Sequence, residues 1–120
     1  MPTHLPAPTV LAAHGSPPKR IVEHVGLTST GTDSLSIAVM SSPPGWTEPA
    51  QVPEFDEWTI VLKGGLHVIH QSGTLEVATG EAVQVAAGEK VQYATPEGAD
   101  YVSVCIPAFS PERVHRATDG

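Results

Sequence analysis

Short runs in which apolar and polar residues alternate place the strongest constraint on how this chain folds. Successive side chains of a β-strand point to opposite faces, so period-two alternation predicts strands with one buried face. Turn signals such as "SPPG" and "KGG" separate the runs, at the spacing of roughly 8–12 residues that is typical of β-sandwiches and barrels. Together they predict an all-β fold of eight or nine strands. The expected strands are Ile21–Leu27, Ser34–Met40, Trp58–Leu62, Leu66–His70, Thr74–Val77, Ala82–Val85, Lys90–Ala94 and Tyr101–Ile106.

The two ends of the chain depart from this pattern. Residues 1–20 contain five prolines and one glycine, a composition that disfavours helix and predicts an extended N-terminal arm. We expect one barrel domain over residues 21–110, followed by a tail over residues 111–120. Ser110 and Pro111 suit the N-cap and first position of a single helical turn. The tail is expected to be a surface strap and not part of a site.

Charge and cysteine content exclude several classes of partner. Six Lys and Arg residues stand against thirteen Asp and Glu residues, and the formal charge of −7 repels nucleic acid phosphates. The single cysteine, Cys105, excludes an intramolecular disulfide and is compatible with a reducing cytoplasm. We find neither a secretory signal pattern nor an apolar run of membrane-spanning length. We therefore expect a cytoplasmic protein that binds neither nucleic acid nor membrane.

Two spaced patterns in the middle of the chain resemble the signatures of the cupins, a superfamily of small jelly-roll barrels. The first, with five, one, three and six residues between its members, consists of Gly45, Gln51, Pro53, Glu57 and Gly64. The second, with intervals of five, one, two and three residues, consists of Gly80, Ala86, Gly88, Val91 and Thr95. The patterns span residues 45–95. The resemblance implies a cupin-type jelly-roll β-barrel that carries the extended N-terminal arm.

The resemblance breaks at the positions that would hold a metal. Cupins that bind a metal do so through two histidines and a glutamate of the first signature and one histidine of the second. Here Gln51, Pro53 and Val91 occupy the histidine positions, and only Glu57 is kept. Imidazole ligands suit iron, nickel, copper or zinc, whereas an amide and a carboxylate bind such ions weakly. We expect no cofactor; the alternative is a weakly bound divalent metal on Gln51, Glu57 and His70.

The strand that follows Glu57 determines which side chains enter the barrel. If Glu57 points inward, alternation turns Thr59 inward too, and the outward set is Trp58, Ile60 and Leu62. A two-residue turn at Gly64–Gly65 would pair Thr59 with His70 and place His70 close to Glu57. A register shift of one residue would put His67 there instead.

Four carboxylates precede or open this strand, and we expect different roles for them. Burying Glu57 in an apolar barrel costs several kcal/mol unless it is paired or protonated, so an inward Glu57 needs a partner or a raised pKa. That property suits a general acid or base. Glu48, three residues before Gln51, either shares a proton with Glu57 in the cavity or lies exposed at the rim. Glu54 and Asp56 are expected in the solvated rim.

Two later strands supply further candidates. Tyr93 has the same parity as Val91, so it either donates a hydrogen bond to a substrate carbonyl or fills the core. In the last strand one face carries Tyr101, Ser103 and Cys105. The other face carries Val102, Val104 and Ile106. We expect the apolar face to meet the core. Cys105 is expected to be a buried, inert thiol.

Three functions fit these residues. The first is an isomerase, cyclase or lyase that acts by proton transfer on a small apolar or carbonyl-bearing metabolite. Glu57 would be the acid or base, Gln51 and Tyr93 would orient a carbonyl, and Glu48 or His70 would relay protons. The resemblance supports this by analogy, since small cupins occur in bacterial secondary metabolism, polyketide cyclisation included. The alternatives are a non-catalytic small-ligand-binding cupin and a weak divalent-metal lyase.

The outward face of the strand after Glu57 is unusually apolar. Trp58, Ile60 and Leu62 would form one contiguous patch on the surface. Such patches usually mark an interface, so we expect a homodimer, with the N-terminal arm available to cross to the partner.

Overall fold

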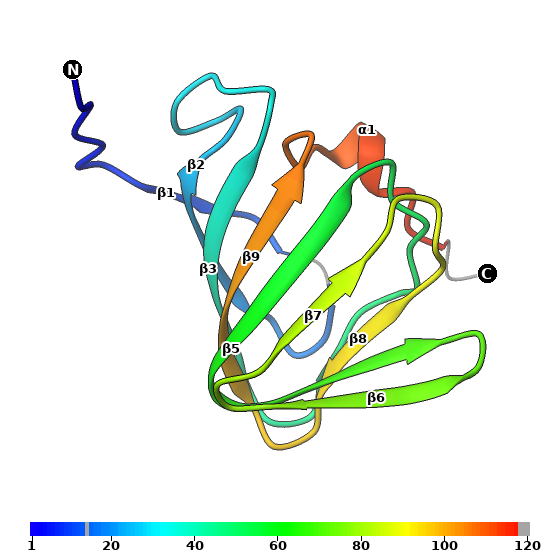
Figure 1. The fold of residues 1–120 in the computed structure, drawn as a ribbon. Coiled ribbons are helices and arrows are strands. Elements are labelled where there is room, and N and C mark those ends of the chain that lie inside the picture. Colours follow the sequence, from blue (N-terminus) through cyan, green and yellow to red (C-terminus); the bar gives the residue numbers. More distant parts are fainter. Residues whose placement is uncertain (14, 118–120) are drawn as a thin grey trace.

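The described residues form one antiparallel sheet that curls on itself. The computed structural model describes residues 1–13 and 15–117. Its strands are β1 (Thr9–Leu11), β2 (Arg20–Val25), β3 (Ser36–Ser42), β4 (Trp46–Thr47), β5 (Asp56–His70), β6 (Gly73–Ala78), β7 (Ala82–Val85), β8 (Gln92–Thr95) and β9 (Ala99–Ile106), and its helix is α1 (Pro111–Val114). The sheet order is β1-β2-β3-β9-β5-β8-β4, and β6 and β7 also pair with β5. Figure 1 shows the two walls that this curl creates. The predicted all-β barrel is confirmed.

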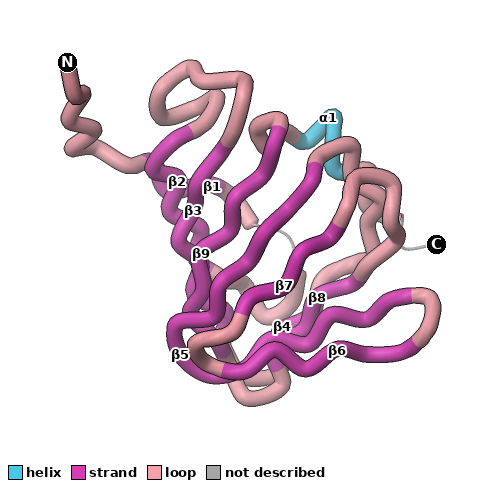
Figure 2. Tube along the Cα trace, viewed as in Figure 1, coloured by secondary structure: helices cyan, strands magenta, loops and turns pink. Residues whose placement is uncertain are grey.

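Strand β5 joins the two walls. Its first half pairs with β9 and β7, and its second half pairs with β6 and β8. The predicted two-residue turn at Gly64–Gly65 is wrong, because the strand bends there and continues to His70 (Figure 2). Gly64 has a φ of 76°, and a Cβ at this position would lie 2.1 Å from the carbonyl oxygen of Gly98. The glycines therefore allow a close approach and a bend, and the hairpin turn comes after His70.

The inward and outward faces of β5 follow the predicted alternation. Glu57, Thr59 and Val61 are buried, whereas Ile60 and Leu62 are 46% and 52% exposed. Farther along, Leu66 and Val68 belong to the packed core. The inward face of β5 therefore changes along its length from polar to apolar. The polar first half of the strand lines a cavity, and the apolar second half packs in the core of the barrel.

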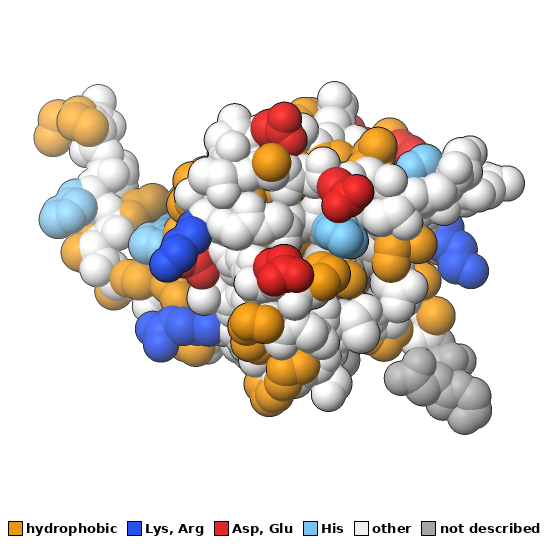
Figure 3. Space-filling model, turned by 90° about the horizontal axis from the view of Figure 1, so that it is seen from below, with side chains coloured by type: hydrophobic (Ala, Val, Ile, Leu, Met, Phe, Trp, Pro, Cys, Tyr) orange, Lys and Arg blue, Asp and Glu red, His pale blue; other side chains and the backbone are white. Residues whose placement is uncertain are grey.

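The surface carries hydrophobic side chains among its charges. Figure 3 shows the face seen from below, where hydrophobic side chains are scattered and carboxylates lie apart from one another. Ile60 and Leu62 are exposed on β5 as the sequence predicts, and Trp58 is half-buried. Homodimerisation through this outer face stays a prediction.

The terminal segments are tied to the barrel. In the arm, β1 pairs with β2, and Ser16 exchanges two backbone hydrogen bonds with Thr47, of 2.9 and 3.1 Å. At the other end, α1 begins after Ser110 with Pro111 in its first turn, as predicted. Val114 of this helix packs with Phe55 and Cys105 in a small second core. Strand β1, Ser16 and helix α1 are thereby held against the barrel.

The part of the chain that the structure describes contains no helix with the length and apolar character of a membrane span. The only helix in residues 1–13 and 15–117 is the single turn of α1. Residence in the cytoplasm stays a prediction.

Replacing Gly64 by alanine should separate steric overlap from backbone strain. Gly80 is the matched control, because its φ of 85° is also positive but a Cβ there meets no atom within 4 Å. Gly80→Ala should cost about 1–2 kcal/mol from the left-handed backbone alone. Gly64→Ala should cost about 2 kcal/mol more, since its Cβ overlaps a backbone carbonyl. Urea unfolding of both variants measures the difference. Equal losses would contradict the close approach to Gly98.

Candidate functional site

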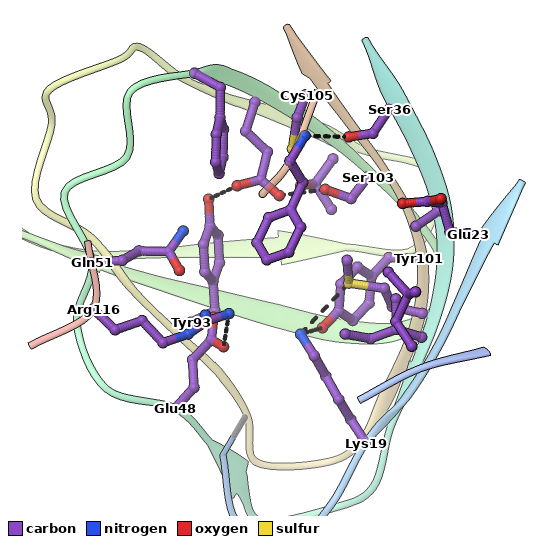
Figure 4. Close-up of a pocket in the computed structure, with 18 residues that line it drawn as sticks. Lys19, Glu23, Ser36, Glu48, Gln51, Tyr93, Tyr101, Ser103, Cys105 and Arg116 are labelled. Carbon is purple, nitrogen blue, oxygen red and sulfur yellow. Dashed lines mark hydrogen bonds and ion pairs between the residues drawn. The ribbon is translucent and has the colours of Figure 1, made fainter. Parts of the chain in front are cut away.

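A cavity opens between the two walls beyond the packed core. Its empty volume is about 650 Å³, counting the part that is open to solvent. The cavity wall comes from the sheet and from both terminal segments (Figure 4). Apolar side chains, among them Ile21, Phe55 and Phe109, make up part of this wall. The polar and charged lining residues are Lys19, Glu23, Ser36, Glu48, Gln51, Glu57, Thr59, Tyr93, Tyr101, Ser103 and Arg116.

Glu57 lies at the polar end of β5 and is 8% exposed. The hydroxyl of Tyr93 on β8 donates to its Oε1 at 3.1 Å, and the hydroxyl of Ser103 on β9 donates to its Oε2. Two hydroxyl donors suit a carboxylate, which can only accept. An inward Glu57 needs partners, and strands β8 and β9 supply them. The carboxylate is thereby fixed in position at the cavity wall.

Glu48 faces the same cavity from the segment after β4. It is 5% exposed, so the alternative of rim exposure is wrong. Burial raises the pKa of the Glu48 carboxyl, and the nearby charge of Glu57 raises it further, against the opposing effect of Lys19 and Arg116. Its Oε2 lies 3.7 Å from Nη2 of Arg116 and makes no hydrogen bond within the described residues. The cavity therefore contains a carboxyl group that is biased toward its neutral form.

Gln51 and Tyr93 also reach the cavity. The backbone of Gln51 exchanges hydrogen bonds of 2.8 and 3.0 Å with Val91, which fixes its position, and its side-chain amide points inward (Figure 4). Burial raises the pKa of Tyr93 well above its usual value, and Glu57 adds to this effect. The Tyr93 hydroxyl therefore remains a neutral donor, and in this structure it holds Glu57.

The structure does not bring His70 into the cavity. Because β5 continues past Gly64–Gly65, His70 lies at its far end, where its Nδ1 accepts a hydrogen bond from the Ser72 backbone at 3.3 Å. His67 does not replace it; its Nε2 lies 3.5 Å from Glu76 on β6. The proposed proximity of His70 to Glu57 is wrong, since it depended on a turn that the chain does not make.

Strand β9 turns its polar face to the cavity. Tyr101, Ser103 and Cys105 are buried, whereas Ile106 of the other face is 45% exposed. The expectation that the apolar face meets the core is wrong, because this end of the barrel encloses a site whose carboxylate needs donors. Cys105 is a buried thiol as predicted, and burial raises its pKa above its usual value.

Two basic residues of the site, Lys19 and Arg116, were missed by the sequence reasoning. Lys19 enters the cavity from the arm, and Arg116 enters it from the tail, where its guanidinium lies 5.8 Å from the Phe109 ring. The prediction of the tail as a surface strap is thus incomplete. One signal was available: two inward carboxylates in an apolar barrel require compensating charge, and the chain contains only six Lys and Arg residues.

The donor set does not fit the metal that many cupins bind. The histidine positions hold a buried valine, a proline and an amide, and both oxygens of Glu57 already accept hydroxyl hydrogen bonds. Within residues 1–13 and 15–117, no three or more His, Cys, Asp or Glu side chains are grouped to hold an ion. His70, the expected third ligand beside Gln51, lies outside the cavity. The three ligands of the alternative weak metal site, Gln51, Glu57 and His70, therefore do not lie together.

The curled antiparallel sheet, with a site at the polar end of its longest strand and the two spaced signatures around it, defines a cupin. The chain belongs to the family described as "Ethanolamine utilisation protein EutQ", which it matches over residues 14–110.

Solved structures support the fold. A putative ethanolamine utilisation protein Q from Salmonella typhimurium LT2 is 19% identical, with a TM-score of 0.68 over 86% of this chain and 98% of that one. The polyketide cyclase RemF from Streptomyces resistomycificus is 18% identical, with a TM-score of 0.76 over all of this chain and 87% of that one. At such identities the likeness shows the fold alone.

A curated relative shares more sequence. The protein from Myxococcus xanthus (strain DK1622) described as endoribonuclease YbeY is 50% identical over 102 residues, which are 83% of this chain and 35% of the relative. This chain thus spans about a third of the relative's length. The endoribonuclease activity in that name is stated for the longer relative.

Replacing Glu48 should change how stability depends on pH. Because folding raises the pKa of Glu48 above its usual 4.5, the unfolded chain releases this proton first as pH rises, and the free energy of unfolding falls through that range. Glu48→Gln should remove this part of the fall. Urea unfolding measured across acidic to neutral pH provides the test.

The matched control is Glu97→Gln, which alters an exposed carboxylate in the turn before β9. This variant should keep the pH dependence of the unaltered chain. Identical pH dependence in Glu48→Gln and the unaltered chain would show that the Glu48 carboxyl is not biased toward its neutral form.

Proposed function

We propose that this chain is a small-molecule enzyme that moves a proton on a carbonyl-bearing metabolite in the cavity. The observation that carries the proposal is the pair of buried carboxyl groups in unequal surroundings. Glu57 is held by two hydroxyl donors, and Glu48 has a pKa that burial raises. Two carboxyl groups in unequal surroundings are typical of acid and base partners in one active site.

The roles follow from the contacts. Glu57 acts as the base that removes a proton from the carbon beside the carbonyl, and the amide of Gln51 donates to the carbonyl oxygen. Glu48, when neutral, supplies a proton to the product. Tyr93 and Ser103 are positioning residues, because their hydroxyl groups aim the carboxylate of Glu57. His70 has no part in this scheme.

The reaction class is that of an isomerase, cyclase or lyase whose first step is proton transfer beside a carbonyl. The described structure of the polyketide cyclase RemF shares this fold, which supports a cyclase by analogy only. The family description suggests ethanolamine utilisation as a setting. We prefer the proton-transfer chemistry as the proposal because it rests on residues of this chain.

Replacing Glu57 should abolish proton exchange on a carbonyl compound. We expect the unaltered chain to speed the exchange of α-protons of cyclohexanone, or of another ketone in a panel of cyclic and linear ketones, into D₂O. Glu57→Gln should lower the catalysed rate at least about 100-fold, the size typical of a lost general base. Proton NMR follows the exchange, and Glu97→Gln should match the unaltered chain.

Two results would contradict the proposal. One is exchange that proceeds equally well in Glu57→Gln. The other is binding of the ketones, seen by NMR shifts of cavity residues, without any exchange above the uncatalysed rate. That second result would favour the non-catalytic ligand-binding cupin.

A further inference from the structure

Lys19 is held in the cavity by weak partners. Its Nζ lies 3.5 Å from the sulfur of Met40 and 3.5 Å from the hydroxyl of Tyr101, and 4.3 Å from the centre of the Trp46 ring. An ammonium group usually has carboxylate or carbonyl acceptors. Within the described residues, the hydrogen-bond acceptors of this amine are a thioether and a phenol.

The electrostatic surroundings agree with this geometry. Burial lowers the pKa of Lys19 below its usual value, and the charge of Arg116 lowers it further, while Glu48 and Glu57 oppose the shift. Figure 4 shows the side chains of Lys19 and Glu48 both extending into the pocket, Lys19 from the lower right of the view and Glu48 from the lower left. A lysine whose amine is kept neutral by burial is a nucleophile toward carbonyl groups.

We propose that Lys19 is a catalytic amine that binds an aldehyde or ketone in the cavity as an imine. The inference rests on the proposed function only in placing a carbonyl compound there. It adds a covalent step that Glu57 does not perform. It also gives the N-terminal arm a role, because the arm delivers the amine to the cavity.

The step balances with groups of the cavity. The neutral amine of Lys19 adds to the carbonyl carbon, and one proton passes from nitrogen to oxygen to give a carbinolamine. The neutral carboxyl of Glu48 then donates its proton to the hydroxyl group, which leaves as water while nitrogen forms a double bond to carbon. The products are a protonated imine on Lys19 and the carboxylate of Glu48, so charge is conserved. Addition of water reverses the step.

This adduct would assist the proposed proton transfer. A protonated imine withdraws electrons more strongly than a carbonyl, so the proton on the adjacent carbon becomes more acidic. Glu57 would remove that proton to leave a neutral enamine. Lys19, Glu48 and Glu57 would then act in succession on one bound molecule.

Reductive trapping tests the imine without a known substrate. Benzaldehyde and cyanoborohydride are added to the full chain near neutral pH; the hydride reduces each imine to a stable secondary amine, which peptide mass mapping locates. Lys63 and Lys90 are exposed and serve as internal controls. We expect Lys19 to react at least about tenfold faster than either control, because burial lowers its pKa and leaves more of its amine neutral and nucleophilic. Reaction at Lys19 that is equal to or slower than at both controls would overturn the inference.

Variants keep this test separate from that of the proposed function. Lys19→Arg should lose the fast-reacting site, whereas Lys63→Arg should keep it. In the Glu57→Gln variant, the imine should still be trapped at Lys19, although the variant loses ketone proton exchange. Selective trapping without ketone exchange in the unaltered chain would uphold the imine and refute the proposed function. Ketone exchange that depends on Glu57, without selective trapping at Lys19, would uphold the proposed function and refute the imine.

Discussion

The burial of the Glu57 carboxylate is the constraint on which the rest of the site depends. A charge in the mouth of an apolar barrel costs several kcal/mol unless partners replace water. Two such partners come from β9, which pairs with β5 beside Glu57, and from β8, which pairs with the second half of β5. The need for Ser103 explains why β9 turns its polar face inward. Two basic side chains, Lys19 from the arm and Arg116 from the tail, line the same cavity.

The bend of β5 allows one strand to serve both stability and the site. Before Gly64 the inward side chains change from Glu57 and Thr59 to Val61, and after it they are core residues such as Leu66. A regular hairpin at this point would have brought His70 back beside Glu57. The glycine instead permits contact with the Gly98 turn, and the strand crosses to the other wall. The position of His70 outside the cavity follows from this path.

Local periodicity predicted the fold and part of the site. The inward positions of Glu57 and Tyr93 follow from alternation within one strand, which depends only on neighbouring residues. The orientation of β9 and the place of His70 depend on how distant strands pair, which alternation does not encode. Lys19 and Arg116 lie in segments without periodicity. Their positions come from long-range contacts of the arm and tail, so only the charge of the inward carboxylates hinted at them.

A crystal structure of the chain soaked with cyclohexanone would examine whether the cavity around Glu57 receives a carbonyl compound. We predict that the carbonyl oxygen lies within hydrogen-bond distance of the Gln51 amide, with the adjacent carbon facing the Glu57 carboxylate. Lys19 should approach the carbonyl carbon from the opposite side. Cyclohexanone bound only outside the cavity, or bound in it with its carbonyl group directed away from Glu57 and Gln51, would contradict the assignment of this site.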